Sequence, residues 1–82
     1  MTTTDEVRSI LRDVLGIGDR ADRLEAGTPL IGAIPELDSM AVVGVITGIE
    51  ERFGVSVADD EMDASVFATL GSLVEFVDRK LA

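Results

Sequence analysis

The stretch Glu36-Leu37-Asp38-Ser39-Met40 marks the point where a loop turns into a helix. Asp38 is predicted to be the helix N-cap, because its carboxylate can accept hydrogen bonds from the free amides of the first turn. Ser39 then takes the first helical position, with its hydroxyl beside the positive end of the helix dipole. Such a position suits a group that carries a phosphate, and the alternative is an ordinary helix cap with no further role.

Apolar residues repeat at helical spacing on both sides of this stretch. The first helix is expected to begin near residues 3–4, since Thr3 and Glu6 have the spacing of a capping box, and to end at a glycine. The second helix is predicted over residues 39–53 and the last one from Thr69, its N-cap. The residues predicted to face inward are Val7, Ile10, Leu11, Val14 and Leu15 in the first helix, Val42, Val45, Ile46, Ile49 and Phe53 in the second, and Leu70, Leu73, Val74, Val77 and Leu81 in the last.

Two segments between these helices follow no helical pattern. Residues 19–37 contain two prolines and two glycines, which predict a long loop, and apolar residues within it should hold it against the helices. Residues 59–67 are predicted to form a short third helix or turn. The loop residues expected to point inward are Leu24, Leu30, Ile31, Ile34 and Leu37.

Length and composition limit the class of protein. Eighty-two residues, 46% of them hydrophobic, predict one domain over residues 1–82 with a modest aliphatic core. Cysteine is absent, no stretch resembles a signal peptide and no apolar run is long enough to span a bilayer, so we expect a cytoplasmic protein.

The net charge of −9 is concentrated in one segment. Residues 36–63 hold eight acids and a single base, Arg52, for a net charge of −7. This segment is either a solvated face or a surface that attracts basic partner proteins. Nucleic acid is excluded as a partner, because like charges would repel it.

The sequence argues against catalysis by the chain itself. A serine nucleophile needs a base, but the chain has no histidine and its only lysine, Lys80, lies at the far end. Zinc is excluded by the absence of both histidine and cysteine. The acids of residues 59–63 lack the glycine and the final glutamate of a calcium loop, so no metal site is predicted.

From about Val7 to Leu81 the chain resembles an acyl carrier protein. The attachment motif of that family, Asp-Ser-Leu, corresponds to Asp38-Ser39-Met40, and the resemblance continues through residues 49–55 and 66–73. It implies an all-α fold, a small four-helix bundle with three longer helices, a short third helix and a long ordered loop between the first two helices. It also implies a non-catalytic protein that holds acyl intermediates as thioesters on 4′-phosphopantetheine, attached to Ser39 from coenzyme A.

The resemblance implies partners, and two further sets of residues are predicted with them. The partners are a phosphopantetheinyl transferase and acyl-activating, acyl-transfer or condensing enzymes with basic docking surfaces, acting on a monomeric carrier in fatty-acid, polyketide-like or specialised lipid biosynthesis. The predicted docking residues are Met40, Val43, Gly44, Glu50, Glu51, Asp59 and Asp63, and the residues predicted to line an acyl pocket are Val43, Ile46, Val57, Met62 and Phe67.

The exposed face of the second helix departs from the family pattern. It carries Gly44 and Gly48 where acids are common, which suggests either close packing or a smooth docking strip whose replacement by alanine should stabilise the helix. This departure favours a dedicated pathway over general fatty-acid synthesis. Met40 after the serine also leaves open an aminoacyl, D-alanyl or peptidyl carrier, and an unmodified helical interaction module is the alternative of another class.

Overall fold

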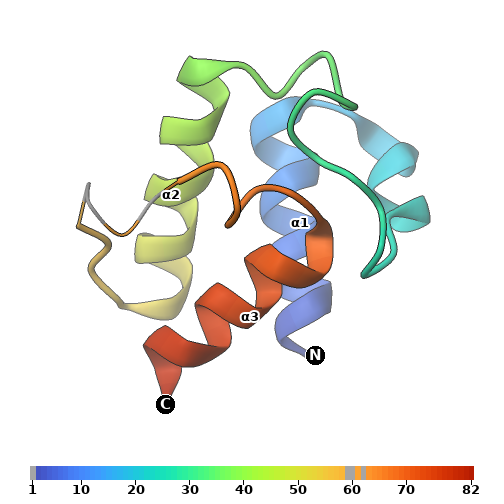
Figure 1. Ribbon diagram of the computed structural model, residues 1–82. Coiled ribbons are helices and arrows are strands. Elements are labelled where there is room, and N and C mark those ends of the chain that lie inside the picture. Colours follow the sequence, from blue (N-terminus) through green and yellow to red (C-terminus); the bar gives the residue numbers. More distant parts are fainter. Residues whose placement is uncertain (1, 59–60, 62) are drawn as a thin grey trace.

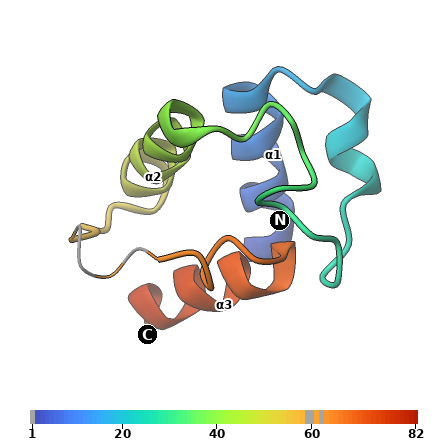
Figure 2. The same ribbon diagram turned by 45° about the horizontal axis from the view of Figure 1, so that its top comes forward.

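Four helical segments build the described part of the chain. The computed structural model describes residues 2–58, 61 and 63–82. Helix α1 is central, because α2, the 3-10 helix η1 and α3 all pack on it, and both chain ends lie on the same side (Figures 1 and 2). The elements in chain order are α1 (Thr3–Leu15), η1 (Gly18–Arg23), α2 (Ser39–Phe53) and α3 (Leu70–Leu81).

Helix α1 begins at Thr3, as expected from the sequence, but its N-cap lies one residue before the predicted one. The Oγ1 of Thr2 accepts a hydrogen bond from the amide of Asp5 at 3.2 Å, so the N-cap is Thr2 and the capping box predicted at Thr3 is wrong by one position. The helix ends at Gly16, whose φ of 64° is strained for a residue with a side chain. The expected inward face is buried except for Val14, which is 36% exposed.

The long connection between α1 and α2 is ordered, as predicted, but it contains a helix that the sequence did not reveal. Residues 18–23 form η1, and Ala21 packs into the core from it. Leu24, Leu30 and Leu37 are buried, as expected, whereas Ile31 is 44% exposed and the prediction that it points inward is wrong.

A pair of antiparallel segments fixes the loop to the start of α3. The amide of Leu30 donates to the carbonyl of Ala68 at 3.0 Å, and the amide of Leu70 donates to the carbonyl of Thr28 at 3.1 Å. This contact is one isolated bridge, and the described residues contain no β-strand. The loop is therefore held by backbone hydrogen bonds as well as by buried leucines.

Helix α2 packs against α1 through its two glycines. A methyl group at Gly44 would lie 3.0 Å from Cγ1 of Val14, and one at Gly48 would lie 2.9 Å from Cγ2 of Ile10. The absent side chains thus allow close approach of the two helices, which corrects the expectation that alanine at both positions stabilises the protein. Along α2 only Val45 and Ile49 are fully buried.

Helix α3 begins as predicted, but two of its residues differ in burial from the predicted inward face. Thr69 is the N-cap, and a reciprocal pair of hydrogen bonds with Ser72 forms a capping box. Phe76 is 5% exposed, whereas Leu81, expected to face inward, is 47% exposed. Of residues 59–67, predicted to form a short third helix or turn, residues 64–67 form turns, and Val66 and Ala68 donate to carbonyls three residues earlier.

Candidate functional site

The start of α2 is fixed by the side chain of Asp38. Its Oδ1 accepts a hydrogen bond from the amide of Ala41 at 2.8 Å, and its carbonyl accepts one from the amide of Val42 at 2.9 Å. This geometry confirms Asp38 as the N-cap. Ser39 is the first helical residue and is exposed, and within the described residues its hydroxyl has no hydrogen-bond partner. The hydroxyl is thus held at a defined place and faces solvent.

The loop before Ser39 is held by an ion pair that the sequence did not predict. The guanidinium of Arg20 in η1 pairs with the carboxylate of Glu36, sixteen residues away. Its hydrogen bond lowers the pKa of the Glu36 carboxyl below the ordinary value. Leu37, the residue after Glu36, is 6% exposed and packs into the core, so polar and apolar contacts together precede the Asp-Ser pair. No local pattern distinguishes Arg20 from the other exposed arginines.

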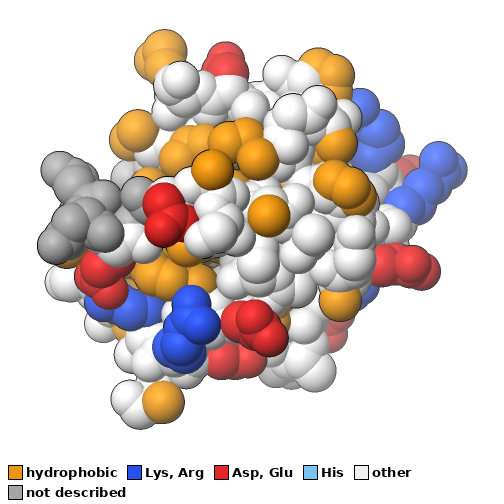
Figure 3. Space-filling model, in the orientation of Figure 1, with side chains coloured by type: hydrophobic (Ala, Val, Ile, Leu, Met, Phe, Trp, Pro, Cys, Tyr) orange, Lys and Arg blue, Asp and Glu red, His pale blue; other side chains and the backbone are white. Residues whose placement is uncertain are grey.

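Apolar side chains surround the serine on the surface. A groove of about 480 Å³ is lined by Ile31, Leu37 and Val42 together with Asp38 and Ser39. Met40 and Val43 are also exposed, by 84% and 62%. Hydrophobic side chains gather on the upper part of the face seen in Figure 3. A partner that reaches Ser39 would therefore contact exposed apolar side chains. Covering these side chains is favourable, because apolar surface in water costs free energy.

Several predicted docking acids have roles inside the molecule. Glu50 accepts a hydrogen bond from the amide of Val57 at 2.8 Å, and Asp63 accepts bonds from the amides of Ser65 and Val66. The pKa of the Asp63 carboxyl is lowered, mainly because the hydroxyl of Ser65 also donates a hydrogen bond to it and further because of the two amide bonds. Glu51 is exposed, and Asp59 lies outside the described residues.

Gly44, also predicted as a docking residue, is directed at α1. Its missing side chain faces Val14, so its conformation and position are explained by helix packing. The smooth strip proposed for Gly44 and Gly48 is therefore not a free surface.

The residues predicted to line an acyl pocket lie between α2 and the segment before α3. Phe67 is 2% exposed, whereas Ile46 and Val57 are half-buried against the core. Val43 is exposed, so it cannot line an interior pocket in this conformation. Met62 lies outside the described residues.

An ion pair closes the far end of this region. Nζ of Lys80 lies 2.8 Å from Oε2 of Glu61, and Glu61 also accepts a hydrogen bond from the amide of Ala58 at 3.0 Å. The hydrogen bond from Lys80 is the main cause of a lowered pKa of the Glu61 carboxyl. Lys80 is thus held in an ion pair with Glu61, and we do not expect it to act as a base for Ser39.

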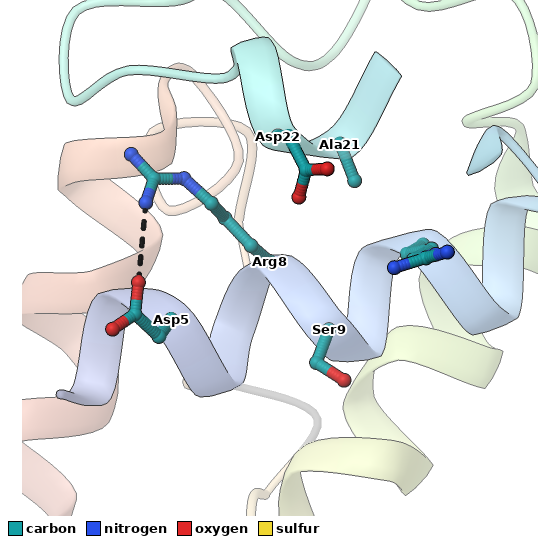
Figure 4. A pocket seen from close by; sticks show the side chains of 6 residues that line it. Asp5, Arg8, Ser9, Ala21 and Asp22 are labelled. Carbon is teal, nitrogen blue, oxygen red and sulfur yellow. Dashed lines mark hydrogen bonds and ion pairs between the residues drawn. The ribbon is translucent and has the colours of Figure 1, made fainter. Parts of the chain in front are cut away.

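A hollow of about 290 Å³ between α1 and η1 is lined by charged side chains, of which Arg8 and Asp5 form an ion pair (Figure 4). The Nη1 of Arg8 lies 3.3 Å from Oδ1 of Asp5, and its Nε donates to the carbonyl of Leu24 at 2.8 Å. Arg8 therefore fastens the end of η1 to α1. Asp22 and Ser9 line the same hollow.

The described residues contain neither a metal-binding cluster nor a membrane-spanning helix. Among the described residues, no three acidic, histidine or cysteine side chains are grouped so that they could hold a metal ion. None of the helices in residues 2–58, 61 and 63–82 has the length and apolar character needed to cross a bilayer.

The fold and the site together define a small helical carrier domain, in which one exposed serine begins a helix. Comparison with known proteins agrees: residues 5–77 match the family described as the phosphopantetheine attachment site. The solution NMR structure of a holo acyl carrier protein from Nitrosomonas europaea is 57% identical in sequence, with a TM-score of 0.91 over 99% of this chain and 98% of that chain.

The chain belongs to the phosphopantetheine-attachment family and is an acyl carrier protein. It is a non-catalytic carrier, its cofactor is covalently attached 4′-phosphopantetheine, and a phosphopantetheinyl transferase is among its partner enzymes. The resemblance found in the sequence and the all-helical fold expected from it are thereby confirmed.

Proposed function

We propose that Ser39 carries the phosphopantetheine arm and that the protein presents acyl thioesters to enzymes of fatty-acid, polyketide-like or specialised lipid biosynthesis. One observation carries this proposal: the Ser39 hydroxyl is exposed at the first position of α2 and is not engaged by the described residues. When attached, the arm supplies a thiol on which acyl groups are held as thioesters.

The residues around Ser39 fit such a group. The N-terminus of α2 presents free amides and a positive partial charge toward the phosphodiester, which is favourable by about 0.3–1 kcal/mol at an exposed position. Asp38 uses its carboxylate for the Ala41 amide, so it positions the serine without acting on it.

The apolar surface around Ser39 supports a docking role. Met40 and Val43 project from the first turns of α2, and Ile31 projects from the neighbouring loop. We propose that a partner enzyme covers these three side chains with an apolar patch. Glu51, exposed at the end of the same helix, would then meet a basic group of the partner.

A longer acyl chain needs more room than this surface offers. We propose that it enters between α2 and the segment before α3, displacing Phe67 from its contact with the core beside Ile46 and Val57. The Lys80–Glu61 ion pair joins α3 to the connection that would have to move. An enclosed chain is protected from water, which is a physical reason for a carrier to open in this way.

We expect residues 1–82 to work as a single, monomeric carrier domain. The principal dimensions of 28, 27 and 21 Å agree with one folded unit around a common core. The cytoplasmic location expected from the sequence stays a prediction.

The decisive experiment is modification by a broad-specificity phosphopantetheinyl transferase with coenzyme A, followed by intact mass measurement. The wild-type protein should gain the mass of one arm. Ser39→Ala should gain nothing, while Ser56→Ala, which removes an exposed serine outside a helix, should be modified as the wild type is. Modification of Ser39→Ala would refute the assignment of Ser39.

Loading assays distinguish the type of cargo. Holo protein is incubated with acyl-activating or amino-acid-activating enzymes and the mass gain is compared. Fatty acyl loading supports the proposal, and exclusive aminoacyl loading would contradict it.

A further inference from the structure

A second apolar recess lies beside the loop that leads to Ser39. It has a volume of about 130 Å³ and is lined by η1 and its flanks on one side and the loop on the other. Ile34 is half-buried there, and Ile17 and Leu24 are buried at its base. The residues that line it are Ile17, Arg20, Leu24, Ala33, Ile34 and Pro35. Arg20 is the only charged one among them.

The size of the recess sets the class of group that fits. An engineered apolar cavity of about 150 Å³ holds one benzene molecule, so this recess accommodates a hydrocarbon group of about five or six carbon atoms. Its lining offers almost no hydrogen-bonding group, which makes it a poor site for water and a good one for a short aliphatic chain.

The carboxylate of Glu36 lies beside residues that line the recess, although Glu36 is not part of the lining itself. Glu36 follows Pro35 in the chain and pairs with Arg20. Pro35 and Arg20 both line the recess. The Arg20–Glu36 ion pair therefore joins the η1 side of the recess to its loop side.

The recess lies within reach of a group tethered to Ser39. Pro35 precedes Ser39 by four residues, which span at most about 14 Å when extended. A flexible arm with two amide units and several methylenes can cover that distance. The recess is already open, so no helix has to move before it is used.

We propose that this recess, the η1 recess, binds a short aliphatic acyl group carried on the arm of the same molecule. The acyl chain lies against Ile17, Leu24 and Ile34. The proposal rests on attachment at Ser39. It adds a resting place for short acyl groups that is separate from the space between α2 and α3.

Methyl NMR spectra of four forms of the protein test the proposal. The apo, holo, acetyl and hexanoyl forms are prepared, the last three by transfer from coenzyme A or its acetyl and hexanoyl thioesters. We expect the methyl signals of Ile17, Leu24 and Ile34 to shift in the hexanoyl form beyond their positions in the acetyl form. We also expect nuclear Overhauser effects between them and the hexanoyl chain.

A variant that fills the recess provides the control. Ala33→Leu places a larger side chain in the lining, while Ala64→Leu makes the same change at an exposed turn elsewhere. Ala33→Leu should abolish the hexanoyl-dependent shifts and leave the mass gain at Ser39 intact, and Ala64→Leu should change neither.

The outcomes separate this proposal from the assignment of Ser39. Absence of any mass gain would remove the attachment site itself. A normal mass gain with identical Ile17, Leu24 and Ile34 signals in the acetyl and hexanoyl forms would overturn the η1 recess alone. Hexanoyl contacts with Ile46 and Val57 in their place would also overturn it, and would favour the space between α2 and α3.

Discussion

Replacing Gly48 by alanine separates helix propensity from helix packing in α2. In a free helix the change would stabilise by about 0.8–1.0 kcal/mol, because alanine has the higher helix propensity. In this protein the new methyl group would lie 2.9 Å from Cγ2 of Ile10, a buried side chain that is only 5% exposed. Overpacking of this kind costs about 1–3 kcal/mol, so the packing cost wins and Gly48→Ala should be less stable than wild type by about 0–2 kcal/mol.

Gly44→Ala is the matched control on the same helix. Its methyl group would lie 3.0 Å from Cγ1 of Val14, but that side chain is 36% exposed and can rotate away. The propensity gain is then largely kept. We therefore expect Gly44→Ala to be more stable than Gly48→Ala by about 1–2 kcal/mol, which is a difference in Tm of roughly 4–16 °C for a domain of this size.

Thermal and urea unfolding of the two variants measure this difference. A double variant adds a direct test of the contact: Ile10→Leu removes the Cγ2 methyl, so it should reduce the cost of Gly48→Ala and give a favourable coupling energy in a double-mutant cycle. If Gly48→Ala raises the stability by about 1 kcal/mol, as in an isolated helix, the proposed close contact between α1 and α2 is refuted.

Three further changes test other parts of the structure. Gly71→Ala should destabilise by about 1–3 kcal/mol, because its methyl group would lie 2.8 Å from the carbonyl oxygen of Ala26, and the urea midpoint should fall with little change in m. Glu61→Gln should lower stability at pH 7 and converge with wild type in acid, since the Lys80 hydrogen bond lowers the Glu61 pKa and its contribution is lost as the pH falls through that lowered value. Asp38→Ala should cost about 0.5–2 kcal/mol in thermal unfolding through loss of the α2 cap.

Each of these changes has a matched control. Gly27 follows Ala26 in the chain, and a methyl group added to it would have no heavy atom of another residue within 4 Å beyond its chain neighbours. Gly27→Ala should therefore be nearly neutral. Glu75→Gln makes the same change at an exposed acid and should leave the stability at pH 7 close to that of wild type. Asp38→Asn keeps a capping oxygen and most of the stability.

The same controls define the results that would contradict the reasoning. If Gly71→Ala and Gly27→Ala changed the stability equally, the close approach of Gly71 to Ala26 would be contradicted. A Glu61→Gln deficit that does not shrink as the pH is lowered would show that the role of Glu61 is not ionic. An Asp38→Ala variant as stable as wild type would mean that the cap contributes nothing.

Local sequence determined the ends of the main helices and the place of the candidate site. Asp38, Gly54 and Thr69 act through hydrogen bonds and backbone preferences within a few residues of themselves, so their roles follow from their neighbours in the chain. The exposed position of Ser39 follows from the same local geometry. The chemistry of the arm was inferred only from the resemblance to acyl carrier proteins, because the spacing of residues in this chain does not indicate it.

Tertiary structure alone decided which residues meet. Arg20 and Glu36 pair across sixteen residues, Gly48 faces Ile10 across two helices, and the direction of Ile31 depends on the backbone bonds of its loop to residues 67–68. Helical periodicity gives the direction of a side chain relative to its own axis, but not the neighbour that lies in that direction. The packing of α1 against α2 and the η1 recess therefore emerge only when the whole chain is folded.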